Sequence, residues 1–530
     1  MEKEFNVTGT CIPEMHYMVD ISNKLDKVFK LIEKGKYFVI NRPRQYGKTT
    51  TLYMLERTLN KNEEYFVISI SFEGVGDLIF EKEQSFVKAF LEIMADSLYF
   101  QHETLSAFLE EEKRNVINFK DLSRAITKFV MKSNKKVILM IDEVDKSSNN
   151  QLFLSFLGML RNKYLLRNVG KDKTFHSVIL AGVHDVKSLK LKIRSDEDHK
   201  YNSPWNIASD FDVDMSFSKK EIGTMLDDYM ESKGVELNKE YFSDKLYFYT
   251  SGYPFLVSKL CKIIDEKIMK EGQLKWEKEY IDMAVKRLLN DDNTNFQSLI
   301  KNIENNNELY DFIRKIVLDG EDMTYVKSDE IVSLGTLHGI LKEKGGNCKV
   351  NNKIYEQLIY NHMMIKVIRN KEYAEISKYN YKSNFISEDG NLDVKKVLIK
   401  FQKFMKHEYS EKREALLEAD GRLLFLAFIS PIINGIGFAF KEVQGGEEKR
   451  FDIVITYNKK MYIVELKVWH GEEYHEKGLV QLGEYLKQYS LDTGYLLIFD
   501  FRKLKAEAGK VNQTDIEVDS RKKSIFEVYC

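Results

Sequence analysis

Short apolar runs rich in valine and isoleucine alternate with longer amphipathic stretches in the first third of the chain. The runs are Tyr37 to Ile40, Tyr65 to Ile70, Val137 to Ile141 and Val178 to Leu180. Strands separated by helical patterns are typical of an α/β fold with a mainly parallel sheet. From about Glu221 to Asn290 the apolar residues recur with a helical period, as in YPFLVSKLCKIIDEKIM. The pattern therefore predicts an α/β domain with a helical lid.

The pattern changes at the polar stretch NDDNTN, Asn290 to Asn295. Helical patterns follow, then GGNCKVNNKIYEQLI and the run MMIKVI (363–368), which we interpret as strand-like. From about Lys396 helix and strand patterns mix again. We therefore predict three domains: an α/β domain with its lid (1–290), a small helical connector (291–395) and a C-terminal α/β domain (396–530).

Composition is typical of a globular protein. Of 530 residues, 43% are hydrophobic and 31% are charged. The formal net charge is −1, so bulk charge does not indicate nucleic-acid binding, and only a local basic patch could serve it. The four cysteines are scattered without a CxxC pair. This usage fits a reducing compartment and provides no zinc motif.

No segment has the features of a signal peptide or a membrane span. The N-terminus MEKEFNVTGT lacks the apolar core of a secretory signal, so we expect a cytoplasmic protein. The uncharged segment LLFLAFISPIINGIGFAF (423–440) has a length near that of a span. Its second half holds Pro431, Asn434 and two glycines, which interrupt helices and strands. We interpret it as a buried helix, a turn and the start of a buried strand.

The loop NRPRQYGKTT, Asn41 to Thr50, follows the apolar run YFVI and precedes the helical pattern TTLYMLERTL. A strand, a loop ending in Gly-Lys-Thr and a helix are the context of a phosphate-binding loop, where free N–H groups at the helix start bind phosphate. Arg42 stands where the general pattern has its first glycine. We assign Lys48 to the outer phosphates and Thr49 to magnesium. The residues that we expect to contact the nucleotide are Arg44, Gln45, Tyr46, Gly47, Lys48, Thr49 and Thr50. The alternative is a basic turn before a helix.

An apolar strand ending in two carboxylates, KKVILMIDEVD (135–145), forms a second motif. This is a Walker B pattern. It predicts that Asp142 holds magnesium through water and that Glu143 polarises the attacking water. The alternative is a solvated acidic strand end, but the pairing with the upstream GKTT favours a nucleotide site.

These motifs, together with VILAGVHDV, SPWNIA and SGYPFLVSKL, resemble the AAA-like, archaeal-type ATPases of the STAND branch of P-loop NTPases. In that family an RPR-x-x-GKT loop replaces the usual first glycine. The resemblance covers about Met1 to Asn290 and implies ATP with Mg²⁺ as ligand and self-association into a homo-oligomer. It also implies that the connector resembles a winged-helix appendage.

The polar sensor residue that often ends the strand after Walker B is not evident. His184 or Asp185 could substitute for it, and the hydrolysis rate stays open. Candidates for an arginine finger are Arg161, Arg167 and Arg194.

The segment RFDIVITYNKKMYIVELKVW (450–469) concentrates charged residues among apolar ones. A hairpin centred near Lys459 places Asp452 opposite Glu465 or its neighbours, and Lys467 shares a strand face with Glu465. Two carboxylates at one point bind Mg²⁺ or Mn²⁺, which prefer oxygen ligands. A nearby lysine stabilises charge on a phosphoryl group. The arrangement suits phosphodiester hydrolysis; the alternative is an edge hairpin with a salt bridge.

The D-x(n)-E-x-K pattern of FDIVITYNKKMYIVELK and the downstream QLGEY resemble the PD-(D/E)XK nuclease superfamily. The resemblance covers about Lys396 to Cys530 and predicts a restriction-endonuclease-like α/β fold, with Phe451 where the family often has proline. It implies metal ligation by Asp452, Glu465 and the Leu466 carbonyl, and catalysis by Lys467. It also implies Gln481 and Tyr485 on the phosphate side and an acid from an upstream helix, for which Glu418 is the candidate and Glu442 the runner-up. We interpret His470 and His475 as surface residues.

The sequence thus predicts an ATP-binding, hydrolysing module joined to a Mg²⁺- or Mn²⁺-dependent nuclease whose access to nucleic acid depends on nucleotide state. We expect DNA rather than RNA as the partner, and no membrane. The alternative is a nucleotide-switched scaffold with an inactive nuclease fold that holds nucleic acid or a partner.

Overall fold

The structure is a computed structural model of the chain. It describes residues 2–144, 151–183, 205, 207–291, 293–319, 321–369, 382–408, 424–426, 428–429, 432–433, 437–442, 452–458, 460–469, 471–488, 491–499, 510–518 and 521–530. Two compact units are present. The first comprises Met1–Asp292, Ser333–Leu341 and Asn351–Lys353, and the second Asn293–Val332, Lys342–Val350 and Ile354–Cys530.

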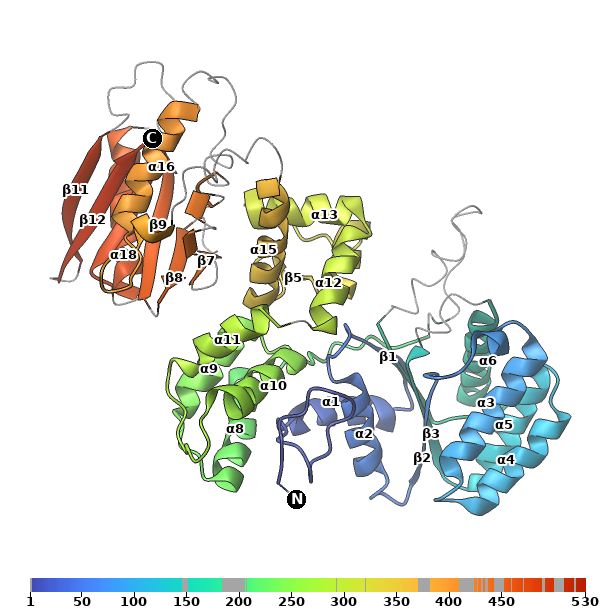
Figure 1. The fold of residues 1–530 in the computed structure, drawn as a ribbon. Coiled ribbons are helices and arrows are strands. Elements are labelled where there is room, and N and C mark those ends of the chain that lie inside the picture. Colours follow the sequence, from blue (N-terminus) through green and yellow to red (C-terminus); the bar gives the residue numbers. More distant parts are fainter. Residues whose placement is uncertain are drawn as a thin grey trace. The chain divides into compact units, whose positions relative to one another are not determined.

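A four-stranded parallel sheet lies at the centre of the first unit (Figure 1). Its order is β1 (Tyr37–Asn41), β4 (Ser177–Gly182), β3 (Lys136–Asp142) and β2 (Tyr65–Ser71). Each strand contains one of the four apolar runs, so the predicted α/β fold with a parallel sheet is confirmed for this unit. The strands are apolar nearly throughout because helices bury both faces of the sheet.

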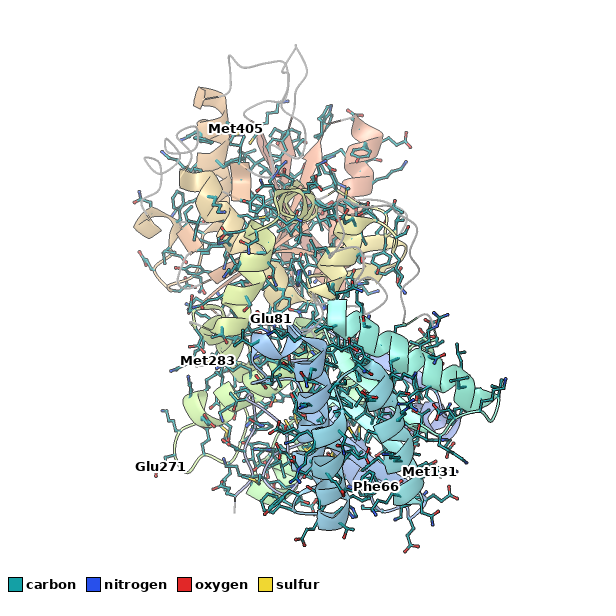
Figure 2. All side chains as sticks on the ribbon, turned by 90° about the vertical axis from the view of Figure 1, so that its right-hand side faces the viewer. Phe66, Glu81, Met131, Glu271, Met283 and Met405 are labelled. Atoms are coloured by element: carbon teal, nitrogen blue, oxygen red, sulfur yellow. The ribbon has the colours of Figure 1, made fainter. Side chains whose placement is uncertain are left out.

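One face of this sheet carries α1 and α2, and the other carries α3 to α6 (Figure 1). Helices α3 to α6 and the sheet share one continuous hydrophobic core. Within this core Phe66, which Figure 2 labels, lies 6.2 Å from the ring of Phe129. The bounds are α1 (Ser22–Glu33), α2 (Lys48–Leu59), η1 (Asp77–Phe80), α3 (Glu83–Leu98), α4 (Glu103–Asn115), α5 (Phe119–Ser133) and α6 (Gln151–Asn168).

The helical period predicted from about Glu221 to Asn290 corresponds to α8 (Lys219–Lys233), α9 (Lys239–Thr250), α10 (Pro254–Ile263), the π-helical η3 (Ile264–Ile268) and α11 (Tyr280–Leu289). Local signals explain where these helices begin. The Ser218 hydroxyl and the Glu221 carboxylate form a capping box at α8. Pro254, which lacks an N–H to lose, occupies the first turn of α10.

The connector contains α12 (Thr294–Glu304), α13 (Asn307–Arg314), η4 (Lys315–Asp319), α14 (Glu330–Leu337), β5 (Leu341–Lys344), β6 (Asn347–Val350) and α15 (Lys353–Arg369). The strand-like interpretation of MMIKVI is wrong, because this run lies in α15. The buried residues Tyr355, Ile359 and Met363 continue a helical spacing of four into the run. No proline or glycine interrupts the helix. The weak preference of the β-branched residues for strands is therefore not enough to end it.

A six-stranded mixed sheet follows, in the order β11-β12-β10-β9-β8-β7 (Figure 1). Helix α18 packs on one face with the apolar residues of β8, β9, β10 and β12. On the other face, α16 brings Phe401 to 6.4 Å from the ring of Phe499. The bounds are η6 (Lys382–Phe385), α16 (Val394–Glu408), β7 (Gly437–Glu442), β8 (Asp452–Tyr457), β9 (Lys460–Val468), α18 (Glu472–Gln488), β10 (Thr493–Phe499), β11 (Val511–Val518) and β12 (Arg521–Tyr529).

The uncharged segment 423–440 contains the predicted buried helical part and strand start, and the predicted turn lies outside the described residues. Residues 424–426, 428–429 and 432–433 are helical and buried, and β7 begins at Gly437. Within the described parts of the chain, no helix combines the length and apolarity needed to cross a membrane.

Candidate functional site

The Gly-Lys-Thr loop connects the carboxyl end of β1 to the start of α2. Gly47 precedes the helix with φ 76°, a left-handed conformation that glycine adopts without strain. The next residue, Lys48, is buried, and its Nζ donates to the carbonyl oxygens of Arg42 and Pro43, both at 3.1 Å. The loop therefore curls around its own lysine ammonium beside the positive end of the helix dipole. A phosphate bound there would meet both charges.

Arg42 contributes to the loop in a way that a glycine could not. Its guanidinium donates to the carbonyl oxygens of Asn41 (2.8 Å) and Val213 (2.6 Å), and it lies 5.3 Å from the ring centre of Phe211. Burial lowers the pKa of Arg42. Arg42 does not have a positive φ. Its backbone conformation therefore does not require glycine, and its side chain holds the start of the loop in place.

The Walker B carboxylate meets the loop directly. The Thr49 hydroxyl donates to Asp142 Oδ2 at 2.6 Å, and Asp142 Oδ1 accepts from the backbone N–H of Glu143 at 2.9 Å. Only β4 lies between β1 and β3, so the parallel order brings both motifs to one edge. A hydroxyl and a carboxylate in contact are hard oxygen donors that fit Mg²⁺. Glu143 has φ 54°, a left-handed conformation at which a non-glycine residue is strained.

The rest of the loop is tied to neighbouring segments of the first unit. The Tyr46 hydroxyl lies 2.7 Å from Ser216 Oγ, and its ring packs edge-on to Tyr253 with centroids 4.6 Å apart. Tyr253 in turn donates its hydroxyl to the carbonyl oxygen of Arg44. Burial raises the pKa of Tyr46. The backbone N–H of Cys11 donates to Thr50 Oγ1 at 3.1 Å. Ser216, Tyr253 and the N-terminal segment thus all hold the loop. Within the loop, Gln45 has φ 56°.

One of the candidate arginine fingers has a structural role. Arg167 donates to the carbonyl oxygens of Gly35 and Phe175, which lie at the amino ends of β1 and β4. This is the edge opposite the Gly-Lys-Thr loop. Arg194, His184 and Asp185 lie outside the described residues.

In the C-terminal sheet, Asp452 pairs with Glu465 across the β8–β9 hairpin, as predicted. The loop of the hairpin is short: Tyr457 pairs with Lys460, and Asn458 has φ 44°. The Glu465 side chain is fully buried, and the Nζ of Lys467 lies 2.9 Å from its Oε1. The backbone of Asp452 and the buried Glu465–Lys467 pair therefore share one row of the sheet.

Helix α18 extends this arrangement. The Nζ of Lys467 donates to Gln481 Oε1 at 3.4 Å, and Gln481 Nε2 donates to the Tyr485 hydroxyl at 3.0 Å. A Cβ at Gly478 would lie 3.1 Å from Lys467 Cε, so the missing side chain gives the lysine its room. Four of the residues assigned from the sequence, Glu465, Lys467, Gln481 and Tyr485, thus form one connected chain.

The remaining predicted residues of this site differ in what the structure describes. Leu466 is buried on the opposite face of β9, so only its main chain could serve the site. Glu418 lies outside the described residues. Glu442 pairs with Asp452 across β7 and β8, which places Glu442, Asp452 and Glu465 in a single register row.

The sequence interpretation missed a second polar cluster on this sheet face. His475, interpreted as a surface residue, lies in α18 with its Nε2 2.7 Å from Oε2 of the buried Glu527. A glutamate inside the apolar strand SIFEVY was the available signal. Among the side chains that the structure describes, no group of three or more His, Cys, Asp or Glu residues is arranged to hold a metal.

Comparison with known proteins places the first two thirds of the chain. Residues 15–361 match the family model described as an AAA-like domain, which is more than half of the chain. The comparison of this chain with curated proteins found no match.

Several solved structures are similar. The Walker-type ATPase of Pyrococcus abyssi is 13% identical with a TM-score of 0.48, and the match covers 67% of this chain and 99% of that one. The ORC2 protein of Aeropyrum pernix, in ADPNP–ADP complexes, is 11% identical over 68% and 98%, with a TM-score of 0.38. The RuvB Holliday junction branch migration motor of Thermotoga maritima is 14% identical over 64% and 95%, with a TM-score of 0.34. On the family match over residues 15–361, the chain belongs to the AAA-like family of P-loop ATPases.

Proposed function

We propose that this chain is an ATP-binding and ATP-hydrolysing protein whose C-terminal domain is a metal-dependent nuclease of the PD-(D/E)XK type, controlled by nucleotide state. The observation that carries the proposal is the chain Glu465–Lys467–Gln481–Tyr485 beside Asp452. A structural ion pair requires a lysine and a glutamate, but not a second carboxylate in the same row and an aligned glutamine and tyrosine.

At the nucleotide loop, Lys48 would contact the outer phosphates, and the N–H groups from Arg44 to Thr50 would surround them. Thr49 and Asp142 would hold Mg²⁺, consistent with their 2.6 Å contact. Glu143 would accept a hydrogen bond from the attacking water and orient it.

At the C-terminal sheet, Asp452 and Glu465 would hold Mg²⁺ or Mn²⁺, with the Leu466 carbonyl as a further oxygen. Such an ion lowers the pKa of a bound water and neutralises charge on the phosphoryl group. Lys467 would stabilise the charge that develops on the phosphoryl oxygens. Gln481 holds the ammonium of Lys467 in place, and Tyr485 holds Gln481. We propose Glu442 as the additional acid, because its backbone shares the row of Asp452 and Glu465.

Nucleotide control is supported by where the connector meets the loop. Residues 333–341 and 351–353 belong to the first compact unit, although they flank connector strands. Gly339 approaches Pro43 so closely that a Cβ at 339 would lie 2.7 Å from Pro43 Cγ. Asn351 Nδ2 donates to the Gly339 carbonyl at 2.9 Å. A change in the loop on nucleotide binding would therefore reach the connector directly. We further propose DNA rather than RNA as substrate, a homo-oligomer and a cytoplasmic location.

The complete burial of Glu465 favours a second candidate, a nucleotide-switched scaffold with an inactive nuclease fold. A metal or phosphate must reach that carboxylate before any hydrolysis, and its ion pair with Lys467 competes with the metal.

The test is cleavage of plasmid, linear duplex, single-stranded DNA and RNA with Mg²⁺ or Mn²⁺, with and without ATP. Wild type is compared with Asp452→Asn, Lys48→Ala and the control Lys460→Ala, an exposed lysine on β9. Loss of cleavage in Asp452→Asn and altered ATP dependence in Lys48→Ala would support the nucleotide-controlled nuclease. Intact ATP binding with no cleavage of any substrate would favour the scaffold.

A further inference from the structure

The strongest polar cluster outside the described sites joins α18 to β12. His475 Nε2 lies 2.7 Å from Glu527 Oε2, and Glu527 is 1% exposed. The same carboxylate accepts hydrogen bonds from the hydroxyls of Thr514 and, at 3.3 Å, Tyr529. Burial raises the pKa of Glu527, but the hydrogen bonds from His475 and Thr514 outweigh burial and hold that pKa below its ordinary value. Glu527 is therefore an ionised carboxylate in the sheet interior at neutral pH.

An ionised carboxylate at Nε2 determines which ring nitrogen carries the hydrogen. A carboxylate only accepts, so Nε2 carries the hydrogen, and in the neutral ring Nδ1 keeps its lone pair. The ring is further held by Trp469, at 5.5 Å between centroids, and by Tyr529, at 6.3 Å. The His475 side chain is 18% exposed. An imidazole that a carboxylate orients through one ring nitrogen, so that the other nitrogen can accept a proton, is the arrangement of a general base.

This imidazole lies at the same edge and face of the sheet as the proposed nuclease site. Strands β9, β10 and β12 run parallel, so their carboxyl ends coincide. Glu465 and Glu527 both pair with Leu496, and Lys467 and Tyr529 both pair with Ile498. Residues in one row point to one face.

The helix limits the separation further. His475 and Gly478 are three residues apart on α18, where Cβ atoms are roughly 5–6 Å apart. A Cβ at Gly478 would lie 3.1 Å from Lys467 Cε. The Cβ of His475 therefore lies within roughly 9 Å of Lys467 Cε. A phosphate or water between the two side chains would be within reach of both.

We propose that His475, oriented by Glu527, is the proton-transfer residue of the phosphodiester hydrolysis at the Asp452–Glu465–Lys467 site; this inference rests on the proposed function. The oxygen of the attacking water bonds to phosphorus while one water proton passes to His475 Nδ1. The phosphorus–oxygen bond to the leaving sugar oxygen breaks, and that oxygen takes a proton from solvent. His475 then returns its proton to solvent, which closes the cycle.

The ionisable groups around the imidazole come from three elements. Glu527 and Tyr529 face it from β12, Lys467 and Glu465 lie beyond Gly478 on β9, and Glu472, Tyr474 and Glu476 are neighbours on α18. Glu527 is the nearest of these groups, with its Oε2 2.7 Å from Nε2, and the Tyr529 hydroxyl lies 3.4 Å from the same nitrogen.

The test is the pH profile of kcat/KM with Mn²⁺, on whichever substrate the full-length wild type cleaves. We expect the wild-type rate to fall at acid pH, because a protonated imidazole cannot accept the proton of the attacking water. His475→Gln keeps a donor for Glu527 but lacks a base, so the rate should fall about 10²- to 10⁴-fold and the acid limb should disappear. Glu527→Gln should also lower the rate, because the imidazole loses the carboxylate that orients it. The control is His362→Gln, which removes a histidine held by Glu304 at 3.0 Å on the connector and should change neither quantity.

Chemical rescue separates catalysis from folding. Added imidazole should restore cleavage in His475→Ala if the residue transfers a proton, and should not if it only anchors α18. The inference is overturned if His475→Gln keeps the acid limb, or if its loss is no greater than that of His362→Gln. Failure of the wild type to cleave any substrate would overturn the proposed function, and this inference with it.

Discussion

The buried Glu465–Lys467 pair allows a quantitative test of the C-terminal site that does not need a substrate. The two side chains are 0% and 5% exposed, with Oε1 and Nζ 2.9 Å apart. Lys467→Met keeps the length of the side chain and removes its charge. The fully buried carboxylate then loses its ammonium, and breaking a buried pair costs about 3–5 kcal/mol. A cooperative unit of 150–250 residues loses roughly 2–4 °C per kcal/mol, so its melting temperature should fall by roughly 6–20 °C.

Calorimetry of the full-length protein measures this, with Lys460→Met as the control. Lys460 is on the same strand, but its side chain is 57% exposed and 3.6 Å from Asp389. An exposed change of this kind is within about 0.5 kcal/mol of neutral. The double variant Lys467→Met/Glu465→Gln should recover much of the loss, since no uncompensated charge remains.

Metal makes the test specific to the proposed site. Mn²⁺ at Glu465 supplies the positive charge that Lys467→Met removed, so it should raise the melting temperature of this variant more than that of wild type. A ligand at 100 times its Kd stabilises by about 2.7 kcal/mol. If Lys467→Met and Lys460→Met have the same melting temperature, the reasoning about the buried pair is refuted. If it melts lower but Mn²⁺ has no selective effect, the pair is structural and Glu465 does not ligate metal.

Three further predictions concern the ATPase unit. Thr49→Val removes the hydroxyl that donates to Asp142 at 2.6 Å. A hydrogen bond to a charged group contributes about 1.5–3 kcal/mol, so we expect the Mg²⁺-dependent affinity for ATP to fall at least tenfold. Titration with and without Mg²⁺ measures this, and an unchanged Mg²⁺ dependence would contradict the assignment. Gly339→Ala should weaken nucleotide binding and lower stability, because its Cβ would lie 2.7 Å from Pro43 at φ +70°; Gly345→Ala, at φ +60° with nothing within 4 Å, should show only the backbone strain of about 1–2 kcal/mol. Lys163→Met should cost about 3–5 kcal/mol in urea unfolding at pH 7, because Lys163 is buried and 2.7 Å from Asp172. Burial raises the pKa of Asp172, but the hydrogen bonds from Lys163 and Thr127 outweigh burial and leave that pKa lowered. The stabilisation from ionised Asp172 is present above the unfolded pKa of about 3.9 and is lost as pH falls through the folded pKa. The difference in unfolding free energy between Lys163→Met and wild type should therefore shrink below about pH 4.

Local patterns were enough to predict the parts of the fold that depend on neighbouring residues. The run YFVI, the loop and the following helix are contiguous, and each strand of the parallel sheet is a short Val- and Ile-rich run. The Asp452–Glu465 pairing was predictable for the same reason. The hairpin loop is short, so the turn position determines the register of the whole β8–β9 ladder.

Contacts between distant segments were not predictable. The guanidinium of Arg42 binds the carbonyl oxygen of Val213, 171 residues later. The substitution of the first glycine therefore has an explanation that only the fold contains. Similarly, MMIKVI has a strand-like composition, but the helix that begins at Lys353 continues through it.

The two polar sets on the C-terminal sheet show why sequence distance decides what a pattern can reveal. Asp452 and Glu465 are 13 positions apart within one hairpin, so counting from the turn brings them together. Glu527 and His475 are 52 residues apart. His475 lies in α18 and Glu527 in β12, and β10 and β11 come between these elements. No periodicity relates the two residues, and only the burial of Glu527 within β12 shows that a partner is required. A carboxylate in an otherwise apolar strand is therefore best treated as evidence for an unseen partner, and here the partner is the histidine that stands beside the proposed site.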